Sequence, residues 1–328
     1  MLENKNIFIK KKILIYGLGK SGISSYKFLK NKNTLNIFDD NKILNQNSDI
    51  KKKLIKYNDI RNKDFDYIIL SPGININNCL LKKYLFRNLK KIRTDLDIFY
   101  SLYNKNKNIT ITGTNGKSTT VQILYEILKK QKFDVRLVGN IGNPILLEKK
   151  ITKNTLFVIE ASSYQLEYSK FFKSNFGAIL NITPDHLERH KTLKKYIEAK
   201  FKLIENQTSK DFAFLNIQDL HIKKTLKKKN IHSKVIKVNP KIDSKFLKKI
   251  NNRYFLTDGN KENLAFVIEI LKKFNINKKI FIKTLKKFHG LKYRQQIIYK
   301  SKKFTIINDS KATSFSSSIS LLKSLSNV

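Results

Sequence analysis

The sequence lacks the features of disulfide-bonded secreted domains and of membrane proteins. It holds one cysteine, Cys79, in 328 residues, so no disulfide can form within the chain and a reducing compartment is favoured. No segment approaches the roughly 18 consecutive apolar residues of a membrane-spanning helix. Residues 1–12 are charged and have no apolar core of the kind found in signal peptides. We therefore expect a cytoplasmic protein without a membrane partner.

Acidic residues are scarce as well. The chain has 25 aspartates and glutamates against 67 lysines and arginines, which gives a formal net charge of +42. Seven of the basic residues are arginines, and the lysines are spread over the whole length in runs of at most three. A nucleic-acid surface more often concentrates arginines beside aromatic side chains, so we expect no specific nucleic-acid partner. The charge would still speed the approach of anionic substrates.

Length and hydrophobic content predict two domains and part of a third. At about 100–200 residues per domain, a chain of this length holds two, and 41% hydrophobic residues suffice to bury their cores. Short apolar strands at residues 13–16, 35–38 and 67–70 alternate with a helical pattern at residues 24–30. This alternation predicts a parallel, doubly wound sheet, which we assign to a Rossmann-like domain of residues 1–94.

A second α/β domain is predicted for residues 95–290. A strand at 108–112 leads into a glycine-containing loop and an amphipathic helix at 118–130, which favours a P-loop-type ATPase domain. The other predicted elements are buried strands at 156–160 and 177–182 and helices at 263–274 and 279–288. Residues 291–328 hold a strand at 304–308, a polar turn and the start of a helix, which is too little for a domain. We expect the chain to stop inside a third domain.

A glycine-rich turn, Gly-Leu-Gly-Lys-Ser-Gly at residues 17–22, follows the first predicted strand, and Asp39 ends the next one. This spacing matches the dinucleotide fingerprint, in which glycines let the backbone approach a diphosphate at a helix N-terminus. The Asp39 carboxylate would accept hydrogen bonds from a sugar or a base. The motif predicts a site for NAD or another nucleotide, and a tight turn without a ligand is the structural alternative.

The strongest local signal is Gly-Thr-Asn-Gly-Lys-Ser-Thr at residues 113–119, between a predicted strand and a long predicted helix. The backbone N–H groups of such a loop form a nest for phosphate oxygens. Lys117 would supply a positive charge to the β- and γ-phosphates, and the Ser118 hydroxyl suits Mg²⁺. The motif is two residues shorter between its glycines than the strict phosphate-loop pattern.

Two further polar groups follow predicted buried strands. Glu160 ends one of them, where a carboxylate is well placed to hold a hydrated Mg²⁺ near phosphates, and a helix-capping role is the alternative. Residues 181–190 follow the next strand, and His186 among them is a candidate metal ligand or general base, or a structural residue. In a chain with 60 lysines, no physical argument singles out Lys200.

Taken together, these segments resemble the Mur ligases of peptidoglycan precursor synthesis. Four motifs occur in the family's order, namely the 113–119 loop, Glu160, Asn-x-Thr-x-Asp-His at 181–186 and Tyr-x-x-Ala-Lys at 196–200. Within the family, the chain is most similar to the members that add D-glutamate to UDP-N-acetylmuramoyl-L-alanine. The features shared with those members are the 17–22 turn with Asp39, Ser71-Pro72-Gly73 and the segment 160–167.

The resemblance implies two substrate sites. The first domain would hold the uridine diphosphate of the sugar substrate rather than NAD. The binding positions that match are Lys20, Ser21, Asp39 and Ser71 in the first domain and Asn140 in the central domain. D-glutamate would be the second small-molecule substrate.

The resemblance also implies an ATP site and a metal site. ATP would contact Gly113, Thr114, Asn115, Gly116, Lys117, Ser118 and Thr119. The implied catalytic residues are Lys117, Glu160, His186 and Lys200, and the implied metal ligands are Ser118, Glu160, His186 and Lys200, the last as a carbamate. A lysine ammonium, with its ordinary pKa of about 10.4, would repel Mg²⁺, whereas its carbamate is an anionic oxygen ligand.

Later segments of the chain match the family's nucleotide contacts with departures. The matching residues are Asn260, Asn263, Arg294, Asp309 and Lys311. Gly259 stands where the family's adenine-binding segment has histidine, and Tyr293 and Gln296 replace a histidine and a glutamate around Arg294. Asp309 and Lys311 would face the nucleotide from the C-terminal domain.

The implied activity is that of an ATP-dependent ligase that forms a C–N bond through an acyl phosphate, with ATP and Mg²⁺, as a monomer. Family members continue through a full Rossmann-like C-terminal domain, so we expect this chain to be truncated there. Three alternatives stay open. They are another Mur or folylpolyglutamate-type ligase, an NAD-dependent oxidoreductase that would explain the 17–22 turn alone, and an inactive, truncated nucleotide-binding remnant.

Overall fold

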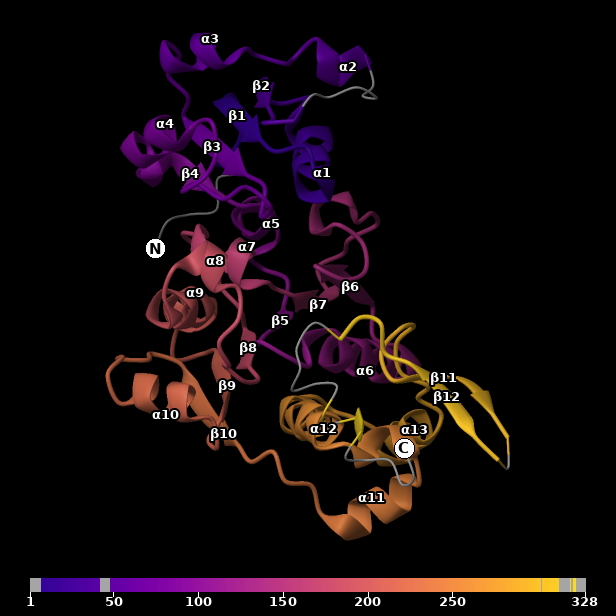
Figure 1. Cartoon of the computed structure of the whole chain (residues 1–328). Helices are drawn as coiled ribbons and strands as arrows, with labels where there is room; N and C mark the ends of the chain where they lie inside the picture. Colours follow the sequence, from indigo (N-terminus) through magenta and orange to yellow (C-terminus); the bar gives the residue numbers. More distant parts are fainter. Residues whose placement is uncertain (1–6, 42–47, 302, 313–318, 320, 323–328) are drawn as a thin grey trace.

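Two parallel β-sheets organise the protein (Figure 1). The computed structural model describes residues 7–41, 48–301, 303–312, 319, 321 and 322. Among them, a four-stranded sheet, a six-stranded sheet and a two-stranded antiparallel pair follow one another along the chain. The α/β fold class with parallel sheets is therefore confirmed.

The N-terminal sheet has the strand order β2-β1-β3-β4, and all its strands are parallel. Its strands are β1 (Lys12–Tyr16), β2 (Thr34–Phe38), β3 (Tyr67–Leu70) and β4 (Ile92–Arg93), and the helices between them are α1 (Lys20–Leu29), α2 (Ser48–Lys51), α3 (Tyr57–Arg61) and α4 (Lys82–Arg87). Strands β1 to β3 were predicted within one residue, because buried parallel strands read as continuous apolar runs. Helix α1 begins four residues earlier than predicted, directly after Gly19.

The central sheet has the order β10-β9-β8-β5-β7-β6 and is also parallel throughout. Its strands are β5 (Asn108–Thr112), β6 (Val135–Gly139), β7 (Leu156–Glu160), β8 (Phe176–Ile179), β9 (Phe212–Asn216) and β10 (Lys234–Val238). Strands β5 and β7 have the predicted bounds. The strands that were not predicted include β6 and β10, which form the two edges of the sheet and carry basic residues that interrupt the apolar run.

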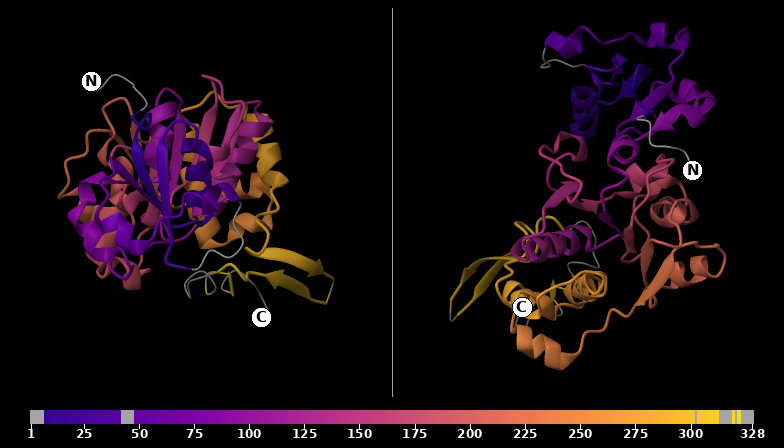
Figure 2. Two further views of the ribbon diagram at one scale, coloured as in Figure 1. Left: turned by 90° about the horizontal axis from the view of Figure 1, so that it is seen from above. Right: turned by 180° about the vertical axis from the view of Figure 1, so that it is seen from behind.

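Helices cover both faces of the central sheet (Figures 1 and 2). Helices α6 (Lys117–Lys130), α12 (Asp258–Leu271) and α13 (Lys278–Lys286) pack on one face, and α5 (Asp95–Tyr103) and α9 (Leu193–Glu205) pack on the other. Along β7, Val158 packs in the hydrophobic cluster under α6, α12 and α13, whereas Phe157 and Ile159 pack in the second cluster, under α5 and α9. This alternation follows the two-residue period of a strand. The second cluster continues to Ile13 and Ile15 of β1, so the two large sheets share one core.

The last described segment forms an antiparallel pair of β11 (Gln296–Lys300) and β12 (Thr305–Asn308) that projects from the body (Figures 1 and 2). Strand β12 was predicted within one residue, and β11 was not predicted. The helix predicted to start beyond Lys311 falls mainly on residues outside the described ranges. No helix within those ranges is long and apolar enough to cross a membrane.

A buried aspartate near the start of α5 joins this helix to the turn after α7. The Asp97 carboxylate is fully buried and accepts hydrogen bonds from the backbone N–H of Thr94 and of residues 170–172, and from the Ser169 hydroxyl. One side chain therefore satisfies most of the polar hydrogens of the turn after α7 (Ser163–Glu167).

We expect Asp97→Ala to lower the free energy of unfolding by about 3 kcal/mol or more, because several buried N–H groups would lose their acceptor. Urea denaturation followed by circular dichroism measures the change. Asp59→Ala, at an exposed position of α3, is the matched control and should shift the midpoint little. Similar midpoints for the two variants would contradict this account of Asp97.

Candidate active site

The loop between β5 and α6 depends on one glycine in the left-handed region. Gly116 has φ +83°, and a Cβ atom at this position would lie 2.0 Å from Asn263 Oδ1. Only glycine avoids both the backbone strain and the clash. The turn lets α6 begin at Lys117, so the unsatisfied N–H groups and the positive end of the helix dipole lie at the loop, where an anion is stabilised.

Two lysines from different helices converge on a single carbonyl of this loop. Lys117 Nζ donates to Gly113 O at 2.9 Å and to Thr114 O at 2.7 Å, and Lys200 Nζ donates to Gly113 O at 2.7 Å. Burial lowers the pKa of Lys200 well below its ordinary value, and the charge of Lys117 adds to that shift. Burial also lowers the pKa of Lys117, although Glu160 opposes the change. The two amino groups thus form a compact site for negative charge.

Glu160 lies at the end of β7 and presents one unsatisfied oxygen. Its side chain is buried, and Asn140 Nδ2 donates to Oε1 at 2.8 Å. Oε2 is buried and has no hydrogen-bond partner among the described residues. A buried carboxylate oxygen without a partner is costly, and a cation beside Glu160 would satisfy it.

His186 follows β8 and precedes α8 (Leu187–His190) in the left-handed conformation, with φ 55°. Its ring centroid lies 5.0 Å from that of Tyr164 and 6.3 Å from that of Tyr196. The Tyr196 ring in turn lies 4.4 Å from Lys200 Nζ, and the Tyr196 hydroxyl is 3.1 Å from Thr114 Oγ1. The predicted His186, Lys200 and the loop are therefore neighbours across Tyr196.

The predicted metal ligands stay a prediction. Within the described part of the chain, no group of three or more histidine, cysteine, aspartate or glutamate side chains is close enough together to hold a metal. The predicted set of Ser118, Glu160, His186 and carbamylated Lys200 includes only two residues of those types.

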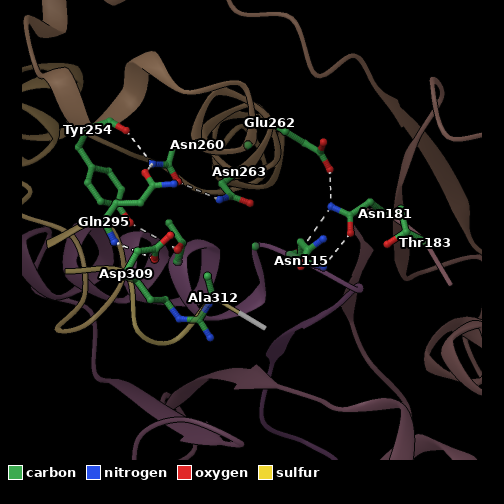
Figure 3. Close-up of a pocket in the computed structure, with 14 residues that line it drawn as sticks. Asn115, Asn181, Thr183, Tyr254, Asn260, Glu262, Asn263, Gln295, Asp309 and Ala312 are labelled. Carbon is green, nitrogen blue, oxygen red and sulfur yellow. Dashed lines mark hydrogen bonds between the residues drawn. The ribbon is translucent and has the colours of Figure 1, made fainter. Parts of the chain in front are cut away.

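A pocket of about 260 Å³ beside the loop brings predicted ATP contacts together from four parts of the sequence (Figure 3). The predicted residues that line it are Asn115, Gly116, Thr119, Asn260, Asn263, Arg294 and Asp309. Asn263 Nδ2 donates to Asn260 Oδ1 at 3.3 Å, and Asn260 Nδ2 donates to Gln295 Oε1 at 2.8 Å. The Gln295 N–H donates to Asp309 Oδ1 at 3.0 Å, and burial raises the pKa of Asp309. One hydrogen-bonded wall thus runs from α12 to the turn after β12.

Several lining residues were absent from the predicted set. They are Asn181, Thr183, Tyr254, Gly259, Glu262, Gln295 and Ala312. Asn181 and Thr183 belong to the Asn-x-Thr-x-Asp-His motif, so the sequence contained a pattern from which these two residues could have been predicted. Lys311 was predicted here but does not line the pocket, and its Nζ lies 5.6 Å from the Tyr293 ring.

A second pocket, of about 530 Å³, lies at the carboxyl ends of β1, β2 and β3. Lys20, Ser21, Asp39 and Ser71 all line it, so the four predicted residues of the first domain are brought together. Ser71 Oγ donates to Gly17 O at 2.6 Å, and Asp39 Oδ2 accepts from Leu18 N at 2.6 Å. These bonds hold the glycine turn in shape. The carboxyl edge of a parallel sheet is where such folds bind ligands.

A buried acid connects the second pocket to the central domain. Asp95, at the start of α5, accepts from Ser21 Oγ at 2.6 Å and from Gln165 Nε2 at 3.3 Å. Burial raises the pKa of Asp95. Asn140, the other predicted substrate contact, does not line the second pocket and instead binds Glu160.

Two family models match the sequence. The Mur ligase middle domain matches residues 111–277, and the MurD-like N-terminal domain of Mur ligases matches residues 11–92. The first match includes the 113–119 loop beside the 260 Å³ pocket, and the second includes the 17–22 turn beside the 530 Å³ pocket.

Curated relatives match nearly the whole chain. UDP-N-acetylmuramoylalanine–D-glutamate ligase of Rickettsia prowazekii is 35% identical over 346 positions, which cover 98% of this chain and 76% of that protein. The ligase of the same name from Clostridioides difficile is 35% identical over 341 positions, with 96% and 75% covered.

Solved structures share the fold at lower identity. The MurF ligase of Thermotoga maritima, in complex with ADP, has a TM-score of 0.55 at 13% identity, with 98% of this chain and 73% of that chain covered. The ligase MPL of Neisseria meningitides also has a TM-score of 0.55 at 13% identity, with 86% and 99% covered. At these identities the likeness extends to the fold alone.

His190 gives the site a pH-sensitive stability. The side chain is buried, Nε2 lies 3.0 Å from Ser163 Oγ, and Nδ1 has no hydrogen-bond partner among the described residues. Burial, followed by the charges of Arg189 and Lys200, lowers the pKa of His190 to about 4. The unfolded chain takes up a proton near the ordinary pKa of about 6.5, so this contribution to stability is complete above that pH and is lost as the pH falls towards 4.

We expect His190→Gln to unfold with a shallower loss of stability between pH 6.5 and 4 than the wild type. Thermal melts across this range, at one ionic strength, measure the slope. His232→Gln, at an exposed position, should keep the wild-type slope. Equal slopes for His190→Gln and the wild type would show that His190 is protonated alike in the folded and unfolded states.

Proposed function

The chain belongs to the Mur ligase family of ATP-dependent amide-bond ligases, and we propose that it adds D-glutamate to UDP-N-acetylmuramoyl-L-alanine in peptidoglycan precursor synthesis. The assignment of these substrates is supported by the similarity to a UDP-N-acetylmuramoylalanine–D-glutamate ligase along 98% of the chain. The proposal is supported by two pockets, one at the first glycine turn and one at the 113–119 loop, which would be the two nucleotide sites that such a reaction needs.

The proposed reaction activates a carboxylate. An oxygen of the alanyl carboxylate attacks the γ-phosphorus of ATP, the bond to the β-phosphate oxygen breaks, and ADP leaves. The amine of D-glutamate then attacks the carbonyl carbon of the acyl phosphate and gives up a proton. The C–O bond to phosphate breaks, so the products are the amide, ADP and inorganic phosphate.

We propose that Lys117 and the N-terminus of α6 stabilise the transferring phosphoryl group. Lys117 Nζ donates hydrogen bonds to the carbonyls of Gly113 and Thr114. When ATP binds, Lys117 would donate to phosphate oxygens instead. Charge that develops on the phosphoryl oxygens is stabilised best by donors that are already in place and shielded from water. The half-buried Lys117 meets that condition.

Mg²⁺ is proposed at Glu160. The unpartnered Oε2 is the feature of this site that fits a hard cation, and Ser118, His186 and Lys200 as a carbamate would complete the ligands. When bound, Mg²⁺ would neutralise charge on the phosphoryl oxygens. Burial lowers the pKa of Lys200, and the neutral amine is the form that adds CO₂ and loses a proton to give a carbamate.

The remaining assignments follow the same family pattern. Lys20, Ser21, Asp39 and Ser71 would hold the uridine diphosphate, and the wall from Asn260 to Asp309 would hold the nucleoside of ATP. We propose domains at residues 1–94, 95–290 and 291–328, with the last as the start of a C-terminal domain, and a monomer as the acting form.

The proposed activity predicts phosphate release that requires ATP, UDP-N-acetylmuramoyl-L-alanine and D-glutamate together. A colorimetric phosphate assay on the purified chain measures it, with each substrate omitted in turn. Folate and other UDP-muramoyl peptides serve as competing acceptors. Release with one of these acceptors, and none with the proposed pair, would contradict the substrate assignment.

We expect Lys117→Ala to reduce kcat by about 10²–10³, the size of effect seen when one preorganised donor is removed from a developing charge. Lys130→Ala, at the exposed end of the same helix, should retain the wild-type rate. Near-normal turnover by the Lys117 variant would rule out its role at the phosphates.

A further inference from the structure

An acidic side chain faces the pocket that we propose for a polyanion. Glu262 of α12 lines the 260 Å³ pocket together with Asn115 and Gly116 of the loop (Figure 3). A carboxylate near triphosphate oxygens is repelled by them. Its presence in this wall therefore calls for a favourable role that outweighs the repulsion.

Glu262 is held by the carboxamide of Asn181. Asn181 Nδ2 donates to Glu262 Oε1 at 2.8 Å, and the nearby Asn216 side chain also favours the charged form of Glu262. Burial raises the pKa of Glu262, and these two side chains act against that shift. Asn216 Oδ1 is occupied by the N–H of Gln218 at 2.8 Å, so its amino group is the end that remains for Glu262.

Asn181 in turn clamps the peptide of Asn115 in the phosphate loop. Asn181 Oδ1 accepts from Asn115 N at 2.8 Å, and Asn181 Nδ2 lies 3.4 Å from Asn115 O. The backbone carbonyl of Asn181 also accepts from Thr114 N at 2.9 Å. Asn181, two residues after the end of β8, thus holds the backbone of Thr114 and Asn115, directly before the left-handed Gly116.

Glu262 and the Asn115 N–H fix the orientation of the Asn181 carboxamide from two sides. A carboxamide has a donor end and an acceptor end, whereas a carboxylate only accepts. With Glu262 on one side, the amino group must face Glu262 and the oxygen must face Asn115 N–H. The flipped carboxamide would place oxygen against the carboxylate and NH₂ against the N–H, so both contacts would be lost.

We propose that Glu262 is a positioning residue for ATP, which orients Asn181 so that Asn181 holds the 113–116 loop in its phosphate-binding shape. The inference rests on the proposed function only in that ATP binds this loop. Glu262 acts on the loop through Asn181, and its role requires no contact with the nucleotide.

Charge repulsion alone predicts the opposite change in ATP affinity. If Glu262 only repelled phosphates, both Glu262→Ala and Glu262→Gln would bind ATP more tightly than the wild type. A positioning role predicts that Glu262→Ala binds ATP more weakly, because Asn181 loses the acceptor that fixes its orientation. Glu262→Gln retains an acceptor oxygen for Asn181 and should restore binding.

Isothermal titration with ATP and magnesium chloride, and separately with adenosine, measures the effect on the full chain. We expect the dissociation constant for ATP to rise about fivefold in Glu262→Ala, the equivalent of one lost neutral hydrogen bond, and to stay near the wild-type value in Glu262→Gln. The adenosine affinity should not change, because the loop holds the phosphates. Glu269→Gln, which removes an acid from the same helix where it pairs with Lys272, should behave as the wild type.

Equal or tighter ATP binding by Glu262→Ala would overturn the inference, as would an equal loss of adenosine and ATP affinity, which indicates general damage to the pocket. The readout is binding rather than turnover. A chain that binds ATP without releasing phosphate would contradict the proposed function and still allow the Glu262 comparison to decide. A wild-type chain that binds no ATP would overturn the inference together with the nucleotide assignment.

Discussion

The structure depends on a loop that brings two lysine amino groups to one buried carbonyl. Lys117 and Lys200 reach Gly113 O from two different helices on opposite faces of the central sheet. Within the described part of the chain, neither amino group forms an ion pair with a carboxylate, and burial lowers the pKa of both. Such a site is unfavourable for folding, and an anion beside Lys117 would relieve part of the desolvation that the protein alone leaves uncompensated.

The parallel topology explains why the polar groups meet. Strands β5, β7 and β8 are neighbours in the central sheet, and their carboxyl ends lead into the 113–116 loop, Glu160 and Asn181. Because parallel strands end at the same edge, residues far apart in sequence are delivered to one place without any long loop. The same rule applies in the first sheet, where β1, β2 and β3 end at the glycine turn, Asp39 and Ser71.

Strands β1, β3 and β7 were predicted well because each is mainly an apolar run that is buried on both faces. The sequence predicted less where burial is partial, as at β6 and β10, whose basic residues break the run, and at the projecting β11. Local motifs made Lys117, Glu160 and the 181–186 segment candidates. Lys200 became a candidate only through the family resemblance, because its contact with Gly113 O cannot be read from its neighbours along the chain. Glu262 and Tyr254 were missed for the same reason, because their partners lie 81 and 135 residues away.

The two pockets are joined by short polar side chains rather than by packing alone. Asp95 accepts hydrogen bonds from Ser21 of the second pocket and from Gln165. Gln165 Oε1 accepts in turn from the Ser162 N–H, two residues after Glu160. A buried acid with neutral donors is costly, and burial raises its pKa. An apolar contact would join the same helices with a smaller desolvation cost, but the helices could slide past one another. Hydrogen bonds of fixed length between α1, α5 and α7 allow less sliding. A carboxylate carried by one nucleotide can meet the γ-phosphoryl group of another only if the distance between their pockets is fixed.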